Sequence, residues 1–234
     1  DQEKLTRSGY KTFYEGDNID ELKKVKVMGV DPETGFAQYA RVEEDGSTNI
    51  VGSLSEAVLG NGEMSYVYIG LSRAPYWGGF TNTFTYKGWE LYLHTTYSLD
   101  YKVYNSVLAE YTSGTSWTTS NRHKLPSGLK IWEKPGDKAD IPMINADPAF
   151  VHELNSETSF CYTDASHLRI SNIRLTYNFP QQWMKKICVQ SAALSFSCDN
   201  VYTFASKYFA GMDPENVGGW AAPRRFIFGL NVTF

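Results

Sequence analysis

The sequence predicts an all-β fold in which antiparallel strands cross an outer membrane as part of a barrel. The first observation is the alternating apolar face of the closing segment: Phe226, Phe228, Leu230, Val232 and Phe234. The second is that similar segments recur upstream, each close to the roughly 9 to 11 residues that a tilted strand needs to cross a bilayer. The third is that short and long connections alternate between them, as they do in such barrels.

Phe234 is the last residue of the sequence, so an aromatic side chain stands beside a free carboxylate. A soluble core does not suit this pair, because a carboxylate is costly to bury. At a membrane interface, aromatic side chains form a girdle and the carboxylate reaches water. We therefore expect Phe234 to lie near the periplasmic interface, at the end of the strand that closes the barrel.

Four more spanning strands are expected upstream of the closing one. Segments 77–87 and 88–98 read as a hairpin around a tight turn at Lys87-Gly88. Segments 169–179 and 188–200 each alternate an apolar face with a polar face. In a barrel the apolar face meets lipid, whereas a soluble sandwich usually turns its polar face outward. The sequence alone leaves open which face is wet.

Strand directions counted back from a periplasmic C-terminus place both short links, at 87–88 and 180–187, on the periplasmic side. The long connections 99–165 and 202–222 then lie outside the cell. They are rich in Gly, Ser, Thr, Asn, Asp and Pro, as external loops are. Residues 1–74 fall on the same side, and we expect them to form an extracellular loop region.

Residues 1–74 carry weaker strand signals at Val25–Val30 and Phe36–Val42, separated by Asp-Pro and Asp-Gly turns. Residues 75–234 hold the five spanning strands. Because the smallest closed barrels have about eight strands, five strands cannot close one. The chain is therefore expected to be one part of a larger barrel, whose other strands come from the same polypeptide or from a second chain.

Composition narrows the class of function. The net charge of −4 and the pI near 5.6 give no basic field for nucleic acid. No window approaches the roughly 20 apolar residues of a membrane-spanning helix. No signal-peptide pattern stands at Asp1, so an export signal is expected upstream or already removed. The four histidines are scattered, and we expect neither a metal site nor a cofactor.

The cysteines number three, an odd count that argues against a disulfide scaffold. Cys188 and Cys198 are expected on one strand, roughly 33 Å apart, which is too far to bridge. Their equal parity predicts lipid-facing or packed apolar thiols. Cys161 is expected to lie alone in a loop.

Six stretches, in order along the chain, resemble segments of SusC/RagA-type TonB-dependent transporters. Gly211-Met212-Asp213-Pro214-Glu215 is similar to the family's G-x-DPE, and residues 223–234 are similar to its closing P-x-x-r-x-x-x-fGlnvtF. The other stretches are 29–35, 76–88, 166–180 and 197–204. Cys198 departs from the pattern, since a small or polar residue is more usual there.

The resemblance implies that the chain is about the last quarter of a 22-stranded barrel in the outer membrane of a Gram-negative bacterium. The plug domain, the TonB box and the earlier strands are absent from this chain. Its implied partners are that N-terminal part of the transporter, TonB through it, outer-membrane lipid and a SusD-like surface lipoprotein.

Two functions remain open. The resemblance implies import of oligosaccharides or oligopeptides, with a SusD-like lipoprotein as lid. The alternative is a soluble, secreted all-β module that binds glycans through aromatic loops. The two differ in solvent: a transporter part requires detergent for extraction, whereas a binding module does not.

No catalytic motif stands in the sequence, and an enzyme is not expected. The acidic stretch Glu43-Glu44-Asp45 is interpreted as a solvated turn. Asp213-Pro214-Glu215 is also interpreted as a turn, with a loop clamp or an ion ligand as alternatives.

Loop aromatics are the candidate ligand contacts, because flat rings stack on sugars or pack against peptide side chains. Packing between loops or a place in the membrane girdle is the competing interpretation. On the polar face, Asn172, Arg174 and Asn178 are expected to hydrogen-bond to neighbouring strands or to a plug. The aromatic candidates are Tyr76, Trp77, Trp117, Trp132, Tyr202 and Trp220.

Overall fold

The computed structural model describes residues 4–7, 11–14, 16, 18–43, 45–112, 128–143, 154–209 and 212–234. The chain divides into two compact units. The first combines Asp1–Arg73 with Asp100–Asp164, and the second combines Ala74–Leu99 with Ala165–Phe234. Among the described residues, no helix has both the length and the apolar character needed to cross a membrane.

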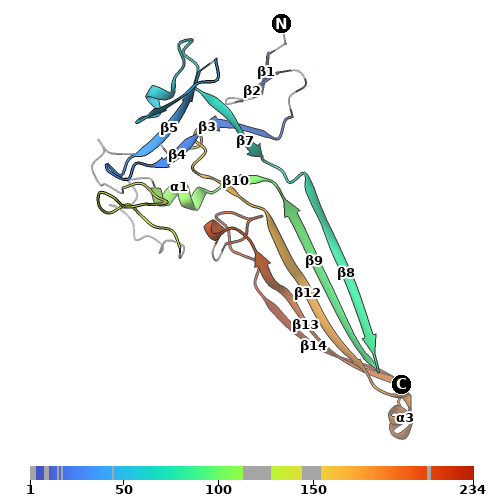
Figure 1. The fold of residues 1–234 in the computed structure, drawn as a ribbon. Coiled ribbons are helices and arrows are strands. Elements are labelled where there is room, and N and C mark those ends of the chain that lie inside the picture. The colour runs from blue at the N-terminus through green and yellow to red at the C-terminus, as the bar shows by residue number, and fades with distance from the viewer. Residues whose placement is uncertain are drawn as a thin grey trace. The chain divides into compact units, whose positions relative to one another are not determined.

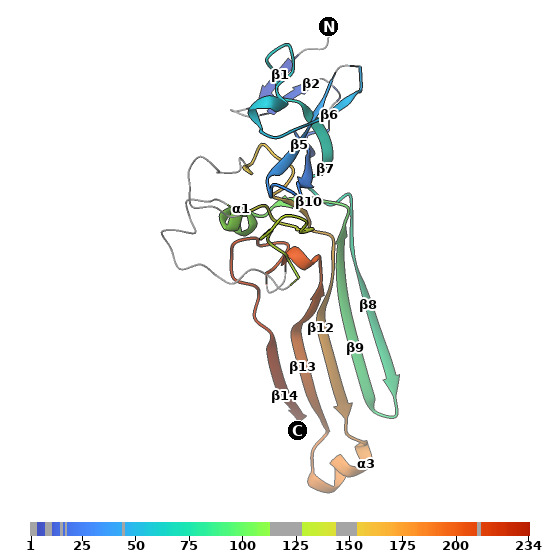
Figure 2. The same ribbon diagram turned by 60° about the vertical axis from the view of Figure 1, so that its left-hand side comes forward.

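The second unit is built on one antiparallel sheet of five strands in the order β14-β13-β12-β9-β8. Figure 1 and Figure 2 both show these strands side by side, with the β8–β9 turn and helix α3 at the end where the C-terminus lies. The five predicted strands are thus present, and their short links share one end with Phe234. Their bounds are β8 Tyr76–Tyr86, β9 Trp89–Leu99, β12 His167–Asn178, β13 Ser191–Phe204 and β14 Arg225–Thr233.

The β8–β9 turn has the predicted two-residue form. Lys87 has φ 45° and Gly88 has φ 87°, the two positive values of a type I′ hairpin turn, whose twist matches that of the strands. Gly88 is required a second time, because a Cβ there would lie 2.9 Å from the carbonyl oxygen of Asn178 on β12. The turn therefore fixes the hairpin and its fit beside β12.

The β12–β13 link differs from the plain polar link expected from the sequence. It folds into α3 (Gln181–Met184) and a 3-10 helix, η3 (Lys185–Ile187), which ends at Cys188 with φ 56°. Strand β13 begins only at Ser191, so the prediction that Cys188 lies on the strand is wrong. Cys188 is exposed, whereas Cys198 is buried on the strand.

Apolar side chains form continuous rows across all five strands, because directly paired residues of antiparallel strands share a face. The ring of Phe196 is stacked on that of Phe226, with centroids 6.2 Å apart, and is tilted by 43° against that of Phe228, with centroids 4.9 Å apart. The predicted alternation is therefore confirmed, and it joins into one apolar face. Its central row is Phe84, Leu91, Leu175, Phe196 and Phe228.

A β-bulge in β12 keeps the two faces separate toward the other end of the sheet. Ile170 pairs with Thr95 and Asn172 pairs with His94, so Ser171 is one extra residue against β9. Uninterrupted alternation would place Arg169 on the apolar face. The bulge instead returns Arg169 to the polar face.

Among the described residues, the first unit contains one three-stranded sheet, one two-stranded sheet and two further strand pairs. Strand β3 (Glu21–Val25) pairs with β7 (Tyr66–Leu71), and β4 (Val27–Val30), β5 (Ala37–Val42) and β6 (Thr48–Val51) form a three-stranded sheet. The strand signals predicted in residues 1–74 are thus real. The pairs are β1 (Lys4–Arg7) with β2 (Lys11–Tyr14), and β10 (Lys102–Tyr104) with β11 (Tyr162–Asp164).

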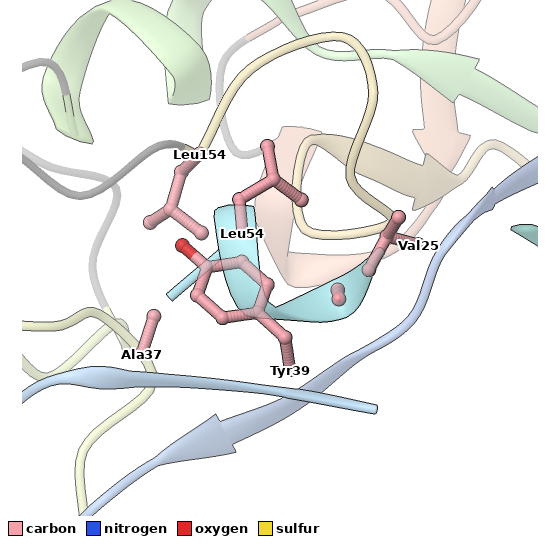
Figure 3. Close-up of a cluster of buried hydrophobic side chains, with 6 residues drawn as sticks. Val25, Ala37, Tyr39, Leu54 and Leu154 are labelled. Atoms are coloured by element: carbon pink, nitrogen blue, oxygen red, sulfur yellow. The ribbon is translucent and has the colours of Figure 1, made fainter. Parts of the chain in front are cut away.

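Residues 100–164 belong to the same compact unit as residues 1–73. They include β10, helix α1 (Ser106–Thr112) and β11, and they pack with residues 1–73. Val25 pairs with Thr158 in a parallel bridge, and its backbone N–H donates to Glu157 O at 3.0 Å. The resulting core is shown in Figure 3 and contains Val25, Ala37, Tyr39, Leu54, Ala57 and Leu154.

Candidate functional site: the polar face and loop end of the sheet

The polar face of the sheet carries its own row across five strands. Its members are Thr81, His94, Asn172, Asp199 and Arg225. The Asn172 amide donates to Asp199 Oδ1 at 2.6 Å, and Arg225 Nη2 lies 3.2 Å from Asp199 Oδ2. The Asp199 carboxylate is therefore held by a partner on each side, as a partly buried charge requires.

Arg174 follows Asn172 by two residues on β12 and therefore shares its face. It lies over the ring of Tyr92, with 5.0 Å from its Cζ to the ring centroid. Thr81 Oγ1 and His94 Nδ1 are 2.8 Å apart. Asn172 thus bonds to a neighbouring strand as expected. Arg174 also contacts a neighbouring strand, although through an aromatic face rather than a hydrogen bond.

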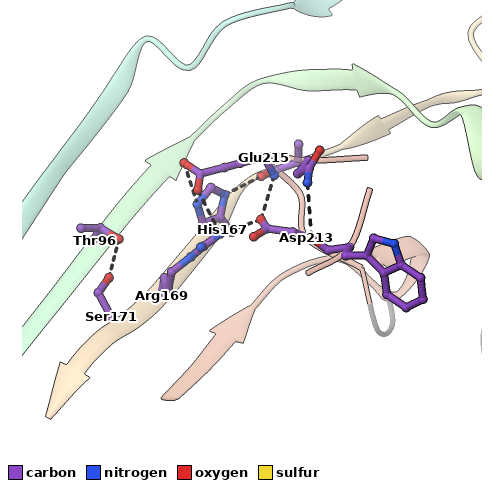
Figure 4. A network of polar contacts seen from close by, with 9 residues as sticks. Thr96, His167, Arg169, Ser171, Asp213 and Glu215 are labelled. Carbon is purple, nitrogen blue, oxygen red and sulfur yellow. Dashed lines mark hydrogen bonds and ion pairs between the residues drawn. The ribbon is translucent and has the colours of Figure 1, made fainter. Parts of the chain in front are cut away.

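Near the start of β12, Arg169 connects the sheet to the segment that follows β13. Figure 4 shows the Arg169 guanidinium between the carboxylates of Asp213 and Glu215. Its Nη2 lies 2.6 Å from Asp213 Oδ1 and 2.9 Å from Glu215 Oε2. Since a terminal guanidinium nitrogen has two N–H groups, one nitrogen donates to both acids. The side chains of Arg169 and Asp213 are 13% and 11% exposed, so this contact is shielded from water.

His167 completes the cluster at the first position of β12. Its ring is buried, and Nδ1 donates to the carbonyl oxygen of Ala165 at 3.0 Å, because a carbonyl can only accept. Nε2 lies 3.8 Å from Glu215 Oε1. Glu215 is therefore flanked by Arg169 and by the imidazole of His167.

Asp213-Pro214-Glu215 forms both a turn and a clamp. Asp213 Oδ1 accepts from the Glu215 backbone N–H at 3.0 Å, and Asp213 O accepts from the Asn216 N–H at 3.0 Å. This confirms the expected turn. The ion pairs with Arg169 also establish the loop clamp, which was the alternative interpretation. Among the described residues, no group of His, Cys, Asp and Glu is placed to hold a metal ion.

Four of the predicted aromatics lie in the second unit, and Trp132 lies in the first. Tyr76 and Trp77 begin β8, Tyr202 lies within β13, and Trp220 lies beyond Asp213, all largely exposed. Tyr202 packs on Phe204 with centroids 4.6 Å apart. Trp117 falls outside the described residues.

Trp132 also has a clear packing contact. Its Nε1 donates to Pro32 O at 2.8 Å. Its ring lies against Gly35, where a Cβ would approach within 2.5 Å. This geometry favours packing between loops, which was the competing interpretation for Trp132.

Sequence reasoning missed Arg169 and His167. A signal was present, since Arg169 has the same odd parity as the apolar Ile173 and Leu175. A charge at such a position indicates either a change of register or a buried partner. The structure contains both.

Comparisons with known proteins agree with the resemblance read from the sequence. No protein-family model matches the chain. TonB-dependent receptor P3 of Formosa agariphila is 27% identical over 81% of this chain and 20% of its own length. TonB-dependent receptor P39 of the same organism is 26% identical over 82% of this chain and 18% of its own length. The chain thus spans about a fifth of the length of the curated relatives it matches.

Among solved structures, a chain of the RagAB peptide transporter superposes with a TM-score of 0.69. The match is 20% identical and covers 92% of this chain and 23% of that chain. The curated relatives are TonB-dependent receptors, and the fold is that of part of a RagAB chain. The predicted resemblance to the SusC/RagA type is confirmed.

Proposed function

We propose that this chain forms part of the barrel wall of a TonB-dependent outer-membrane transporter. The observation that carries the proposal is the sheet with two faces of opposite chemistry. One face presents apolar rows across all five strands, and the other presents a hydrogen-bonded polar row. In a barrel wall, the first face meets lipid and the second meets the lumen.

The exposure of the apolar side chains supports a membrane environment. Phe228 is 78% exposed and Leu230 is 69% exposed within the chain. Leaving such side chains in water forgoes about 1.5–3 kcal/mol each. Contiguous exposed patches of this kind mark surfaces that a partner or a membrane covers. Hydrocarbon would cover this face along its whole length.

The edges of the sheet support membership in a larger barrel. Strands β8 and β14 each have one neighbouring strand among the described residues. Unpaired strand edges are costly in a membrane, where no water satisfies their backbone groups. We assign the missing neighbouring strands to the rest of the transporter. That part would also carry the plug and the segment that engages TonB.

The transporter would import oligosaccharides or oligopeptides, with a SusD-like lipoprotein at the cell surface. The RagAB neighbour is a peptide transporter by its own description. The first unit and the 205–224 segment would then lie outside the cell, while α3 and Cys188 would lie in the periplasm. The role is transport rather than catalysis.

Cys188 gives a direct test of this orientation. In whole cells, a membrane-impermeant maleimide should leave Cys188 unlabelled, and it should label this cysteine once the outer membrane is opened. The protein should also require detergent for extraction and accompany a plug-bearing polypeptide. A protein released without detergent would refute the transporter and support a secreted binding module.

A further inference from the structure

We propose that Arg169 is a positioning residue that latches segment 212–220 to the sheet and thereby presents Trp220 to the transported ligand. This inference rests on the proposed function. It adds to that function a specific loop, the charge that holds it and the side chain that the loop presents. Its basis is one continuous chain of contacts within the second unit.

The latch begins with the charge of Arg169 on the polar face of the sheet. The bulge at Ser171 turns Arg169 onto the polar face, where its Nη2 bridges Asp213 and Glu215. Charge-assisted hydrogen bonds are the stronger kind, and of the two contacts the one to Asp213 is shielded from water, since Glu215 is 54% exposed. Asp213 and Arg169 lie 44 positions apart, so this contact ties the segment to a strand that is distant in sequence.

The latch continues along the segment through short local bonds. Asp213 O accepts from the Asn216 N–H, and Asn216 O accepts from the Gly219 N–H at 3.1 Å. The Asn216 amide then donates to Trp220 O at 3.3 Å. Gly219 lies so close to this amide that an added Cβ would come within 2.4 Å of it. The backbone carbonyl of Trp220 is thus tied to Asn216.

The side chain of Trp220 is left almost bare at the end of this braced segment. It is 96% exposed, whereas its backbone carbonyl accepts a hydrogen bond from the Asn216 amide. A rigid aromatic group with a free face binds a ligand at a low cost in conformational entropy. The chemistry that fits is a C–H-rich or aromatic face, from either a pyranose ring or a peptide side chain.

The first experiment tests the latch without any ligand. Hydrogen exchange of segment 212–220 is measured in the full-length transporter in detergent for the wild type, Arg169→Gln and Arg169→Lys. Arg169→Gln should speed exchange at least tenfold, and Arg169→Lys should restore part of the protection, because an ammonium also has several donors. The matched control is Arg174→Gln, on the same strand and face but over Tyr92. Unchanged exchange in Arg169→Gln would overturn the latch.

The second experiment tests Trp220 with two named probes, fluorescently labelled maltohexaose and a labelled hexapeptide. Trp220→Ala should raise the KM for uptake of one probe about three- to tenfold with little change in the maximal rate. Arg169→Gln alone should also raise the KM. Combined with Trp220→Ala, it should not raise the KM beyond the value of Trp220→Ala alone. The probe that responds identifies the ligand source.

The outcomes separate this inference from the function on which it rests. A wild-type protein that imports neither probe removes the ligand assignment for Trp220, while the exchange result still decides the latch. Normal uptake with an unchanged KM in Trp220→Ala overturns the inference and leaves the transporter intact. Failure of N-bromosuccinimide to oxidise Trp220 in the ligand-free protein would also overturn the inference, because another part of the assembly would then cover the ring.

Discussion

The two compact units of the chain differ in how far their apolar side chains are buried. The first unit buries Val25, Tyr39 and Leu54 in a core of its own, as a water-soluble domain does. The second unit leaves Phe84, Phe228 and most of their row exposed. Both units are made of antiparallel strands, so secondary structure does not cause the difference.

The difference lies in what covers each apolar face. In the first unit, segments from 154–164 pack onto the strands of residues 21–42 and exclude water. In the second unit, no further layer of the described residues covers the apolar rows. The contrast indicates that the first unit is folded by the hydrophobic effect in water, whereas the second requires an apolar surrounding to be stable.

Leu175→Arg should have the largest effect and tests the apolar face directly. Leu175 is the centre of the apolar row, and an arginine at the middle of a lipid-facing strand costs about 2–4 kcal/mol. Folded protein in the outer membrane, followed by heat-modifiable gel mobility, should fall sharply. The matched control is Thr176→Arg, the next residue on the opposite face, which should assemble normally. Equal loss in both variants would contradict lipid contact on one face.

Val25→Ala should have the next largest effect and should act on the first unit alone. Val25 is fully buried, and the loss of two methyl groups with the cavity left behind costs about 2 kcal/mol. Hydrogen exchange should rise in β3 and β5 and remain unchanged in the five-stranded sheet. Ile50→Ala, at an exposed position of β6, serves as control and should shift stability by less than about 0.5 kcal/mol. Faster exchange in the sheet would mean that the units do not fold separately.

Gly88→Ala should weaken the sheet by about 1–2 kcal/mol. Its positive φ disfavours any side chain, and the new Cβ would meet the Asn178 carbonyl. The temperature at which folded protein loses its fast gel mobility should fall. Gly60→Ala is the control, since open space surrounds that position. A Gly88→Ala variant as stable as wild type would show that the turn does not set the fit to β12.

Tyr66→Phe should produce the smallest effect, visible only at high pH. Burial, followed by the hydrogen bond to Glu157, raises the pKa of Tyr66 from 10.0 to about 12. A phenol whose folded pKa is raised contributes stability that is present below pH 10 and is lost as the pH rises from 10 to 12. The wild type should therefore lose more of the stability of its first unit over that interval than Tyr66→Phe does.

The control for this pH dependence is Tyr68→Phe, two residues further along the exposed side of β7. It should follow the wild type when unfolding of the first unit is monitored by near-ultraviolet circular dichroism. Parallel curves for wild type and Tyr66→Phe would show that the Glu157 contact does not contribute in solution.

The sequence predicted most of the second unit because its signals are local. Alternation repeats every two residues, and the Lys87-Gly88 turn is encoded by the two residues that form it. Cys188 was misplaced because α3 and η3 shorten the following strand. Amphipathic alternation does not reveal where a short helix ends.

The clamp at Arg169 could be only partly foreseen. The Asp213-Pro214-Glu215 turn is local, and it was expected. The partner of these acids is set by the bulge at Ser171, which changes the side on which Arg169 points. No neighbouring residue encodes that choice.

The sequence by itself thus determined the five strands, their two faces, the hairpin turn and the resemblance to SusC/RagA-type transporters. Only the tertiary structure decided that residues 154–164 pack with β3, and that Arg169 holds Asp213 and Glu215. The physical reason is the sequence separation over which each interaction acts. Periodicity and turn chemistry act between residues a few positions apart, whereas register, bulges and burial bring together side chains that the chain order keeps far apart.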